Sequence, residues 1–277
     1  MSKIGVFDSG IGGLTLVKAL LAAYPHEEII YYGDTARVPY GSKNTKELIF
    51  LADKITGYLV EQGAELIVDA CNTTSAVALP HLKDNYDLPI FGVIEPGVAK
   101  ALVSTKNGKI GLLATEVTVK TEAHKKLLER NKGIVCYAEA APALVPLIEA
   151  GKINDSATKK AVAQAMAPLM QAGIDTLILG CTHYPFISHC FSEIGQGKIT
   201  LINPAEETVR TMSSLLEPQT LQAGSFNPAS VYFTSKDVKA FAALAKYLLP
   251  EMNFPQFREY DILVKENYEQ NRLCNPQ

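Results

Sequence analysis

The sequence predicts an α/β protein with two pseudo-symmetric, doubly wound parallel-sheet domains and an active site in the cleft between them. The first observation is an internal repeat: residues 62–74 (QGAELIVDACNTT) and 172–184 (AGIDTLILGCTHY) share a turn glycine, an apolar run, a cysteine and a following threonine. The second is a weaker echo, in which KIGV at 3–6 returns as KIGL at 109–112. Two copies of one α/β unit explain both observations.

Length supports the same organisation. The 277 residues are about twice the usual domain size of roughly 100–150 residues. The repeat offsets predict a discontinuous first domain, residues 1–95 plus 205–277, and a second domain formed by residues 96–204. Two crossings of the chain would make a hinged pair with a cleft.

The composition is that of an ordinary globular protein, with 47% hydrophobic and 20% charged residues. A net charge of −3 and a pI near 6.0 leave no basic surface for nucleic acid or anionic lipid. Every long apolar stretch is broken by a charge before roughly 18 residues, and no signal peptide pattern opens the chain, so we expect no membrane association and a cytoplasmic location. Five cysteines without disulfide spacing should remain free thiols.

The elements of the first half follow from short apolar runs, which predict strands, separated by turns and amphipathic segments, which predict helices. The expected order is a strand at 3–7, a glycine-rich turn at 8–13, a helix at 14–23, a strand at 29–34, a loop at 35–44, a helix at 45–62, the Cys71 strand, a helix at 72–79 and a strand at 88–94. Glu95-Pro96-Gly97 then reads as a crossover between domains.

The second half repeats this order and then returns to the first domain. The expected elements are a strand at 109–114, a helix at 118–130, a strand at 133–138, a helix at 155–172, the Cys181 strand, a helix at 205–216, a strand at 230–234 and a helix at 236–248.

The glycine-rich turn at residues 8–13 (DSGIGG) does not fit a nucleotide site. Thr15 stands where the dinucleotide fingerprint needs its third glycine, and no Gly-Lys-Ser/Thr follows. The turn is better suited to present backbone N–H groups at a helix N-terminus, as a site for a carboxylate-sized anion. Asp8 either caps that helix, meets an ammonium group or orients a thiol.

The two repeated cysteines carry the functional prediction. Cys71 and Cys181 each end a buried strand, the edge at which open parallel sheets bind ligands. A disulfide oxidoreductase would place its thiols as Cys-x-x-Cys, and a cysteine hydrolase needs a single nucleophile. Inversion of a carbon centre needs two acid–base groups, one on each face. No cofactor signature is evident, so we expect neither cofactor nor metal.

His183 follows Cys181 by two residues, which places both on one side of an extended segment. The histidine either assists proton transfer or bonds the backbone as a structural residue. A zinc site formed by Cys181, His183, His189 and Cys190 is the metal alternative, although C-x-H-x₅-H-C is not a familiar finger spacing. Cys136 and Cys274 read as a core residue and a tail thiol.

Small hydrogen-bonding residues accompany both strand ends. Tyr40, Gly41 and Ser42 in the 35–44 loop could offer hydroxyl and backbone donors to a substrate, or form a plain surface turn. Asn72 and Thr73 open the helix after Cys71, where ordinary capping uses the same residue types.

In this order the motifs GVFDSGIGGLT, YYGDTARVPYGSK, VDACNTTSA, GVIEPG, APALVPLIEAG and LGCTHYP resemble those of the cofactor-independent glutamate racemases of the aspartate/glutamate racemase superfamily. The resemblance covers nearly the whole chain. It implies interconversion of L- and D-glutamate by two thiols, with D-glutamate feeding peptidoglycan synthesis, and a homodimer.

The resemblance also implies roles for individual residues. Cys71 would deprotonate the D-enantiomer and Cys181 the L-enantiomer, with Asp8 and His183 assisting them respectively, and Glu149 matches an acidic position near the cleft. The residues that match the family's substrate-binding pairs are Asp8, Ser9, Tyr40, Gly41, Asn72, Thr73, Thr182 and His183.

Two departures from the family pattern leave the cysteines untouched: Asn203-Pro204 stands where many members carry Asp-Ser, and Thr74 replaces a common Ala. The alternatives are an aspartate racemase or another isomerase of the superfamily, and a non-catalytic protein that binds an amino acid. Binding alone requires neither thiol.

Overall fold

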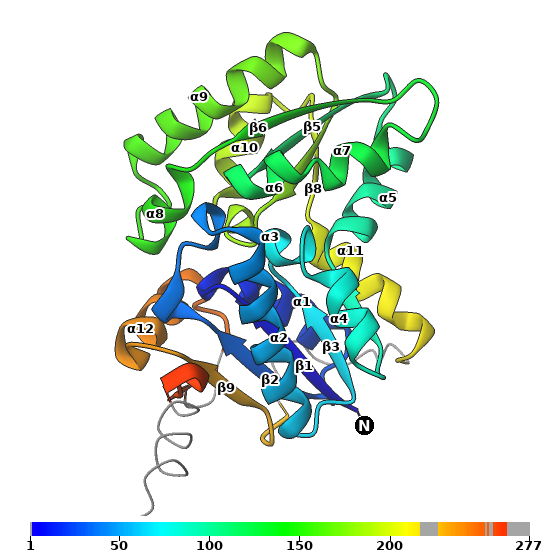
Figure 1. Ribbon diagram of the computed structural model, residues 1–277. Helices are drawn as coiled ribbons and strands as arrows, with labels where there is room; N and C mark the ends of the chain where they lie inside the picture. Colours follow the sequence, from blue (N-terminus) through cyan, green and yellow to red (C-terminus); the bar gives the residue numbers. More distant parts are fainter. Residues whose placement is uncertain (1, 217–226, 253, 255–256, 265–277) are drawn as a thin grey trace, which may run out of the picture.

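Two parallel sheets organise the protein (Figure 1), in a computed structural model that describes residues 2–216, 227–252, 254 and 257–264. The larger sheet has six strands in the order β10-β9-β2-β1-β3-β4, and the smaller has four in the order β6-β5-β7-β8. Figure 1 shows them as two lobes, with the smaller sheet and its helices above the larger. The predicted fold class, two parallel-sheet α/β domains, is therefore confirmed.

The larger sheet is built from both ends of the chain. Its strands are β1 (Lys3–Asp8), β2 (Glu28–Gly33), β3 (Leu66–Asp69), β4 (Ile90–Gly92), β9 (Val231–Thr234) and β10 (Phe257–Glu259). Its helices are α1 (Leu14–Ala23), α2 (Thr45–Glu61), α3 (Asn72–Ser75), α4 (Leu79–Asn85) and α12 (Val238–Leu248).

The smaller sheet uses the middle of the chain. Its strands are β5 (Lys109–Ala114), β6 (Val135–Ala140), β7 (Thr176–Gly180) and β8 (Thr200–Ile202). Its helices are α6 (Glu116–Thr121), α7 (Ala123–Leu128), α8 (Leu144–Glu149), α9 (Ser156–Ala172) and α10 (Ser188–Gly195). Helices α5 (Ile94–Ser104) and α11 (Pro204–Thr211) connect the two sheets.

The sequence repeat corresponds to a repeated topology. The order β2-β1-β3-β4 in one sheet matches β6-β5-β7-β8 in the other, and every strand pair is parallel. Cys71 and Cys181 follow the equivalent strands β3 and β7. The two thiols therefore occupy equivalent edges of two similar units, as the repeat predicts.

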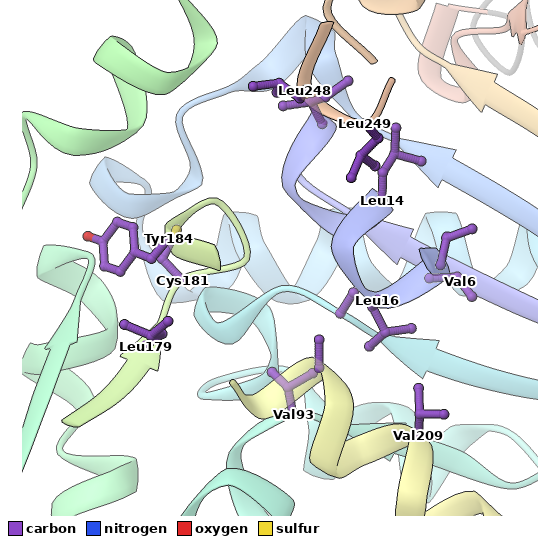
Figure 2. Close-up of a cluster of buried hydrophobic side chains, with 14 of the residues drawn as sticks. Val6, Leu14, Leu16, Val93, Leu179, Cys181, Tyr184, Val209, Leu248 and Leu249 are labelled. Carbon is purple, nitrogen blue, oxygen red and sulfur yellow. The ribbon is translucent and has the colours of Figure 1, made fainter. Parts of the chain in front are cut away.

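The two lobes share a buried core on one side. Helix α11 packs against both α1 and α5, and the hydroxyl of Tyr24 donates to the carbonyl of Val209, 3.3 Å away. Figure 2 shows apolar side chains of both lobes in this core, among them Leu16 and Leu179. Burial of such side chains stabilises the contact between the lobes.

Several elements differ from the sequence prediction. The crossover expected at Glu95-Pro96-Gly97 is made by helix α5, which connects the two sheets, and Pro96 lies in its first turn, where the missing N–H costs no hydrogen bond. Glu122 adopts a left-handed conformation with φ of 56° and divides the expected helix at 118–130 into α6 and α7. Helix α8 and strands β8 and β10 have no counterpart in the prediction. No helix within the described residues has the length and apolar character that a membrane crossing requires.

His124 on α7 is a fully buried histidine, and neither ring nitrogen has a hydrogen-bond partner among the described residues. Burial lowers its pKa from 6.5 to about 4. The unfolded chain therefore binds more protons than the folded protein between these values, so stability falls as the pH drops through that window.

We expect the buried His124 to lower the free energy of unfolding by about 2 kcal/mol when the pH falls from about 7.5 to about 5. Urea unfolding at both pH values checks this, with His124→Leu as the comparison. The variant should lose less stability on acidification than the wild type by that amount. Equal losses in the two proteins would show that His124 is not responsible.

Candidate active site

The two repeated cysteines line one cavity of about 130 Å³ between the lobes. The other predicted site residues that line it are Ser9, Tyr40, Gly41, Ser42, Asn72, Thr73, Glu149, Thr182 and His183. Asp8 is fully buried and lies outside this lining. A larger hollow of about 820 Å³, lined in part by α1 and α11, contains neither cysteine. The smaller cavity is therefore the candidate site.

Cys71 reaches the cavity from the turn between β3 and α3. Its backbone N–H donates to Oδ1 of Asp69 at 3.1 Å, and its side chain is nearly buried, with 5% exposed. Burial raises the pKa of the Cys71 thiol, and a negative charge on Asp8, or on Asp69 when it is ionised, raises it further. Cys71 therefore rests as a thiol, the form that can donate a proton.

Cys181 has a different partner. It follows β7 directly, and its sulfur lies 3.7 Å from Nδ1 of His183. The other ring nitrogen of His183, Nε2, lies 3.1 Å from Oε1 of Glu149 at the end of α8. Burial lowers the pKa of His183, but the hydrogen bonds with Cys181 and Glu149 outweigh it and raise the pKa to about 10. An imidazolium in this place stabilises a thiolate on Cys181.

Asp8 occupies the glycine-rich turn itself. Its Oδ2 accepts hydrogen bonds from the N–H groups of Gly10 at 3.1 Å and Gly13 at 3.0 Å. The carboxylate that these two donors bind is therefore that of Asp8 itself. Burial raises the pKa of Asp8, while His183, the two N–H groups and Thr182 lower it. Thr182 Oγ1 donates to Oδ1 of Asp8 at 3.2 Å, which joins the two lobes.

The two lobes also approach closely at the glycine-rich turn. A Cβ atom added to Gly12 would lie 2.3 Å from Oγ1 of Thr182 and 2.5 Å from Nδ1 of His183. Only a glycine fits in this position without displacing the histidine that contacts Cys181. The turn predicted from its glycines is thus required for lobe packing at the site.

Tyr40 contributes its ring to the cavity wall and to an apolar cluster with Cys71, but its hydroxyl donates to Oδ2 of Asp34 at 2.7 Å. The hydroxyl is thus not the free donor expected from the sequence. Asp34 also accepts from Arg37 at 2.7 Å and from Ser235 at 2.8 Å, so it fixes the 35–44 loop. Asp34 is not among the predicted site residues, although it follows β2 as Asp8 ends β1.

Hydroxyl groups from both lobes meet on one side of the cavity. Oγ1 of Thr73 lies 3.0 Å from Oγ1 of Thr115, which lies 2.9 Å from Oγ1 of Thr118. Thr115 and Thr118 are not among the predicted site residues, although Thr115 occupies the place of Ser9 in the repeat. Asn72 Oδ1 is buried without a hydrogen-bond partner in the described part of the chain, so it can accept one from a ligand.

The four residues of the zinc alternative do not converge. His189 and Cys190 lie on α10, where Cys190 is fully buried, whereas Cys181 and His183 face the cavity. The described residues contain no group of three or more His, Cys, Asp or Glu side chains arranged to hold a metal ion. Cys136 is buried on β6, and Cys274 lies outside the described residues.

Comparisons with known proteins agree with this geometry. Residues 14–212 match the family model described as Asp/Glu/Hydantoin racemase. The chain is 41% identical over 256 residues to the glutamate racemase of Desulforudis audaxviator, covering 89% of this chain and 93% of that protein.

Two solved structures are similar over nearly the whole chain. The glutamate racemase isoform RacE1 from Bacillus anthracis has a TM-score of 0.87 and 34% identity, covering 94% of this chain and 97% of that one. The glutamate racemase from Francisella tularensis, solved in complex with D-glutamate, has a TM-score of 0.84 and 30% identity, covering 94% and 98%. The resemblance seen in the sequence motifs is confirmed, and the chain belongs to the Asp/Glu/Hydantoin racemase family, among its glutamate racemases.

Proposed function

We propose that this protein interconverts L- and D-glutamate by moving the Cα proton between two thiols, with Cys71 on one face of the substrate and Cys181 on the other. The observation that carries the proposal is that two free cysteines, one from each lobe, line the same cavity. The names of the relatives, and the D-glutamate bound to one of them, support glutamate as the substrate.

The surroundings of the thiols suggest their starting roles. Cys181, with the His183 cation beside it, is the base that removes the Cα proton of L-glutamate. Cys71 begins as a thiol and donates its proton to the opposite face of the carbanion, which yields D-glutamate. The turnover leaves Cys181 protonated and Cys71 as a thiolate. In the reverse direction Cys71 is the base and Cys181 the acid.

The rest of the cavity supplies groups for substrate recognition. Hydroxyls of Ser9 and Thr73 can donate hydrogen bonds to the substrate carboxylates. Thr182 also lines the cavity, with its hydroxyl donating to Asp8. Asn72 Oδ1 can accept one from the substrate ammonium group. Glu149 acts on the reaction through His183, which it contacts. Asp8 acts through its charge on Cys71 and its hydrogen bond from Thr182.

The metabolic role, the location, the domain boundaries and the oligomeric state belong to the same proposal. D-glutamate made here would supply peptidoglycan synthesis, and a reducing cytoplasm would keep both cysteines as thiols. The domains are residues 1–95 with 205–277 and residues 96–204, supported by the strands that each sheet contains. The protein forms a homodimer, which sedimentation at several concentrations would test.

Circular dichroism of L-glutamate, and separately of L-aspartate, incubated with the protein and no added cofactor, tests the function. The L-glutamate signal should decay to zero, with L-aspartate unchanged and activity unaffected by exhaustive dialysis against EDTA. Decay of the L-aspartate signal alone would identify an aspartate racemase. Activity lost on dialysis and restored by metal would contradict the cofactor-free mechanism, and tight binding without decay would identify a binding protein.

A further inference from the structure

Asp69 is a buried carboxylic acid next to the Cys71 turn. It ends β3, whose four residues are all buried, and its side chain is fully inaccessible. It is absent from the residues that line the cavity. An ionisable group in such a place costs free energy unless it is neutral or well partnered, so its contacts need an explanation.

The two carboxyl oxygens of Asp69 have different surroundings. Oδ1 accepts hydrogen bonds from the N–H of Cys71 at 3.1 Å and from Oγ1 of Thr74 at 2.6 Å. Oδ2 is buried and has no hydrogen-bond partner in the described part of the chain. Both hydrogen bonds that fix the turn are accepted by Oδ1, and the side-chain oxygen of an asparagine could accept them equally well. The turn therefore does not explain why this residue is an aspartate.

The groups that face Asp69 show what its charge acts on. Asp8, at the end of the neighbouring strand β1, and Cys71 itself are the titratable groups that interact with it. On the other side β4 presents Ile90–Gly92, and α2 contributes Leu48 and Leu51 to the apolar cluster around Cys71. The hydroxyl of Tyr40, in that cluster, donates a hydrogen bond to Asp34.

These surroundings make the charge of Asp69 sensitive to pH. The pKa of Asp69 is raised to about 8. Burial is the main cause, the charge of Asp8 adds to it, and the hydrogen bond from Thr74 opposes it. At neutral pH the group is therefore mostly uncharged. When ionised, Asp69 raises the pKa of Cys71, because a second negative charge beside the thiolate is unfavourable.

We infer that Asp69 is a positioning residue for Cys71: Oδ1 fixes the turn that presents the thiol, and loss of the carboxyl proton hinders formation of the Cys71 thiolate. This inference rests on the proposed two-thiol function. Thr74, whose hydroxyl donates to Oδ1, is the side-chain partner that lowers the pKa of Asp69 most, ahead of Ser75. The transition state places negative charge on Cys71, so racemisation slows when Asp69 is ionised.

The first test is the pH profile of racemisation by the wild type and Asp69→Asn, a variant that keeps the Oδ1 acceptor. The alkaline decline of kcat/KM near pH 8 should move up by about one pH unit or more in the variant. KM should change less than about twofold, because Asp69 does not line the cavity. A uniform fall in activity at every pH, with the decline unmoved, would indicate a merely structural role and overturn the inference.

The second test does not depend on racemisation. Iodoacetamide alkylation of Cys71, followed by mass spectrometry of its peptide, should be at least about threefold faster in Asp69→Asn than in the wild type at about pH 9, and similar at about pH 6.5. Cys181 in the same samples is the internal control and should react equally in both proteins. Equal Cys71 rates at both pH values would overturn the inference even if racemisation is confirmed. Absence of racemisation in the wild type would instead count against the proposed function.

Thr74→Val provides a variant in which the carboxyl group remains. Loss of the Thr74 hydroxyl removes the hydrogen bond that lowers the pKa of Asp69, so the alkaline decline should move to higher pH. Thr74→Ser should restore the wild-type profile. If Asp69→Asn does not fold, this pair still tests the inference, and identical profiles for Thr74→Val and the wild type would contradict it.

Discussion

Replacing either Cys71 or Cys181 with alanine should reduce racemisation by at least about 10²–10⁴-fold, or roughly 3–5 kcal/mol of transition-state stabilisation, in both directions. Under the proposed mechanism each thiol is the acid–base group on its own face of the substrate, and among the described residues no third thiol lines the cavity to replace either one. Circular dichroism, started from each pure enantiomer, measures the loss.

Cys136 and Cys274 provide the control variants. Cys136→Ala and Cys274→Ala should keep most of the wild-type activity, since Cys136 is buried on β6 and Cys274 was predicted to be a tail thiol. Near wild-type turnover by Cys71→Ala or Cys181→Ala would show that the assignment of two thiols is wrong.

Starting from L-glutamate in D₂O, the D-glutamate formed should carry deuterium at Cα in nearly every molecule, while unreacted L-glutamate remains protiated early in the reaction. Under the proposed mechanism the proton removed from L-glutamate stays on Cys181. Cys71 has exchanged its proton for deuterium from the solvent, and it delivers this deuteron to the opposite face. Mass spectra of the separated enantiomers at low conversion give the result.

Two outcomes would contradict this mechanism. Substantial protium in the D-product would indicate a single base that moves between the two faces. Early deuterium in L-glutamate would indicate a carbanion that exchanges its proton before it inverts. Cys181→Ala is a useful comparison, because it should form almost no labelled D-glutamate.

The internal repeat made it possible to predict both the fold class and the two candidate catalytic cysteines from the sequence. Because strands β3 and β7 carry the same pattern, the sequence placed Cys71 and Cys181 at equivalent strand ends, and the structure brings both to one cavity. The spacing of Cys181 and His183 predicted that both lie on one side of the segment, and in the structure the Cys181 sulfur lies 3.7 Å from Nδ1 of His183. Such patterns are local, so they can be read without knowledge of the tertiary structure.

The unpredicted features depend on contacts between distant segments. Thr115 approaches Thr73 only because the two lobes meet, and Asp34 reaches Ser235 only across paired strands. Asp69 gave a weak local signal, an acid at the end of the apolar run LIVD, but its burial depends on the packing of neighbouring strands. Helix α5 was not predicted, because Glu95-Pro96-Gly97 indicated only a crossover, whereas Pro96 lies in the first turn of that helix.

The unequal partners of the two thiols, His183 beside Cys181 and two carboxyl groups near Cys71, have a thermodynamic consequence under the proposed mechanism. L- and D-glutamate are mirror images with equal free energies in water, so their equilibrium ratio is one and kcat/KM must be identical in the two directions. The asymmetry of the protein cannot change the equilibrium ratio of the enantiomers or the equality of the two kcat/KM values. It affects the free enzyme instead: each conversion of L to D leaves the protein in its less stable protonation form. That form must exchange protons with water before it converts another L-glutamate, so the two directions can differ in kcat and KM while their ratio stays the same.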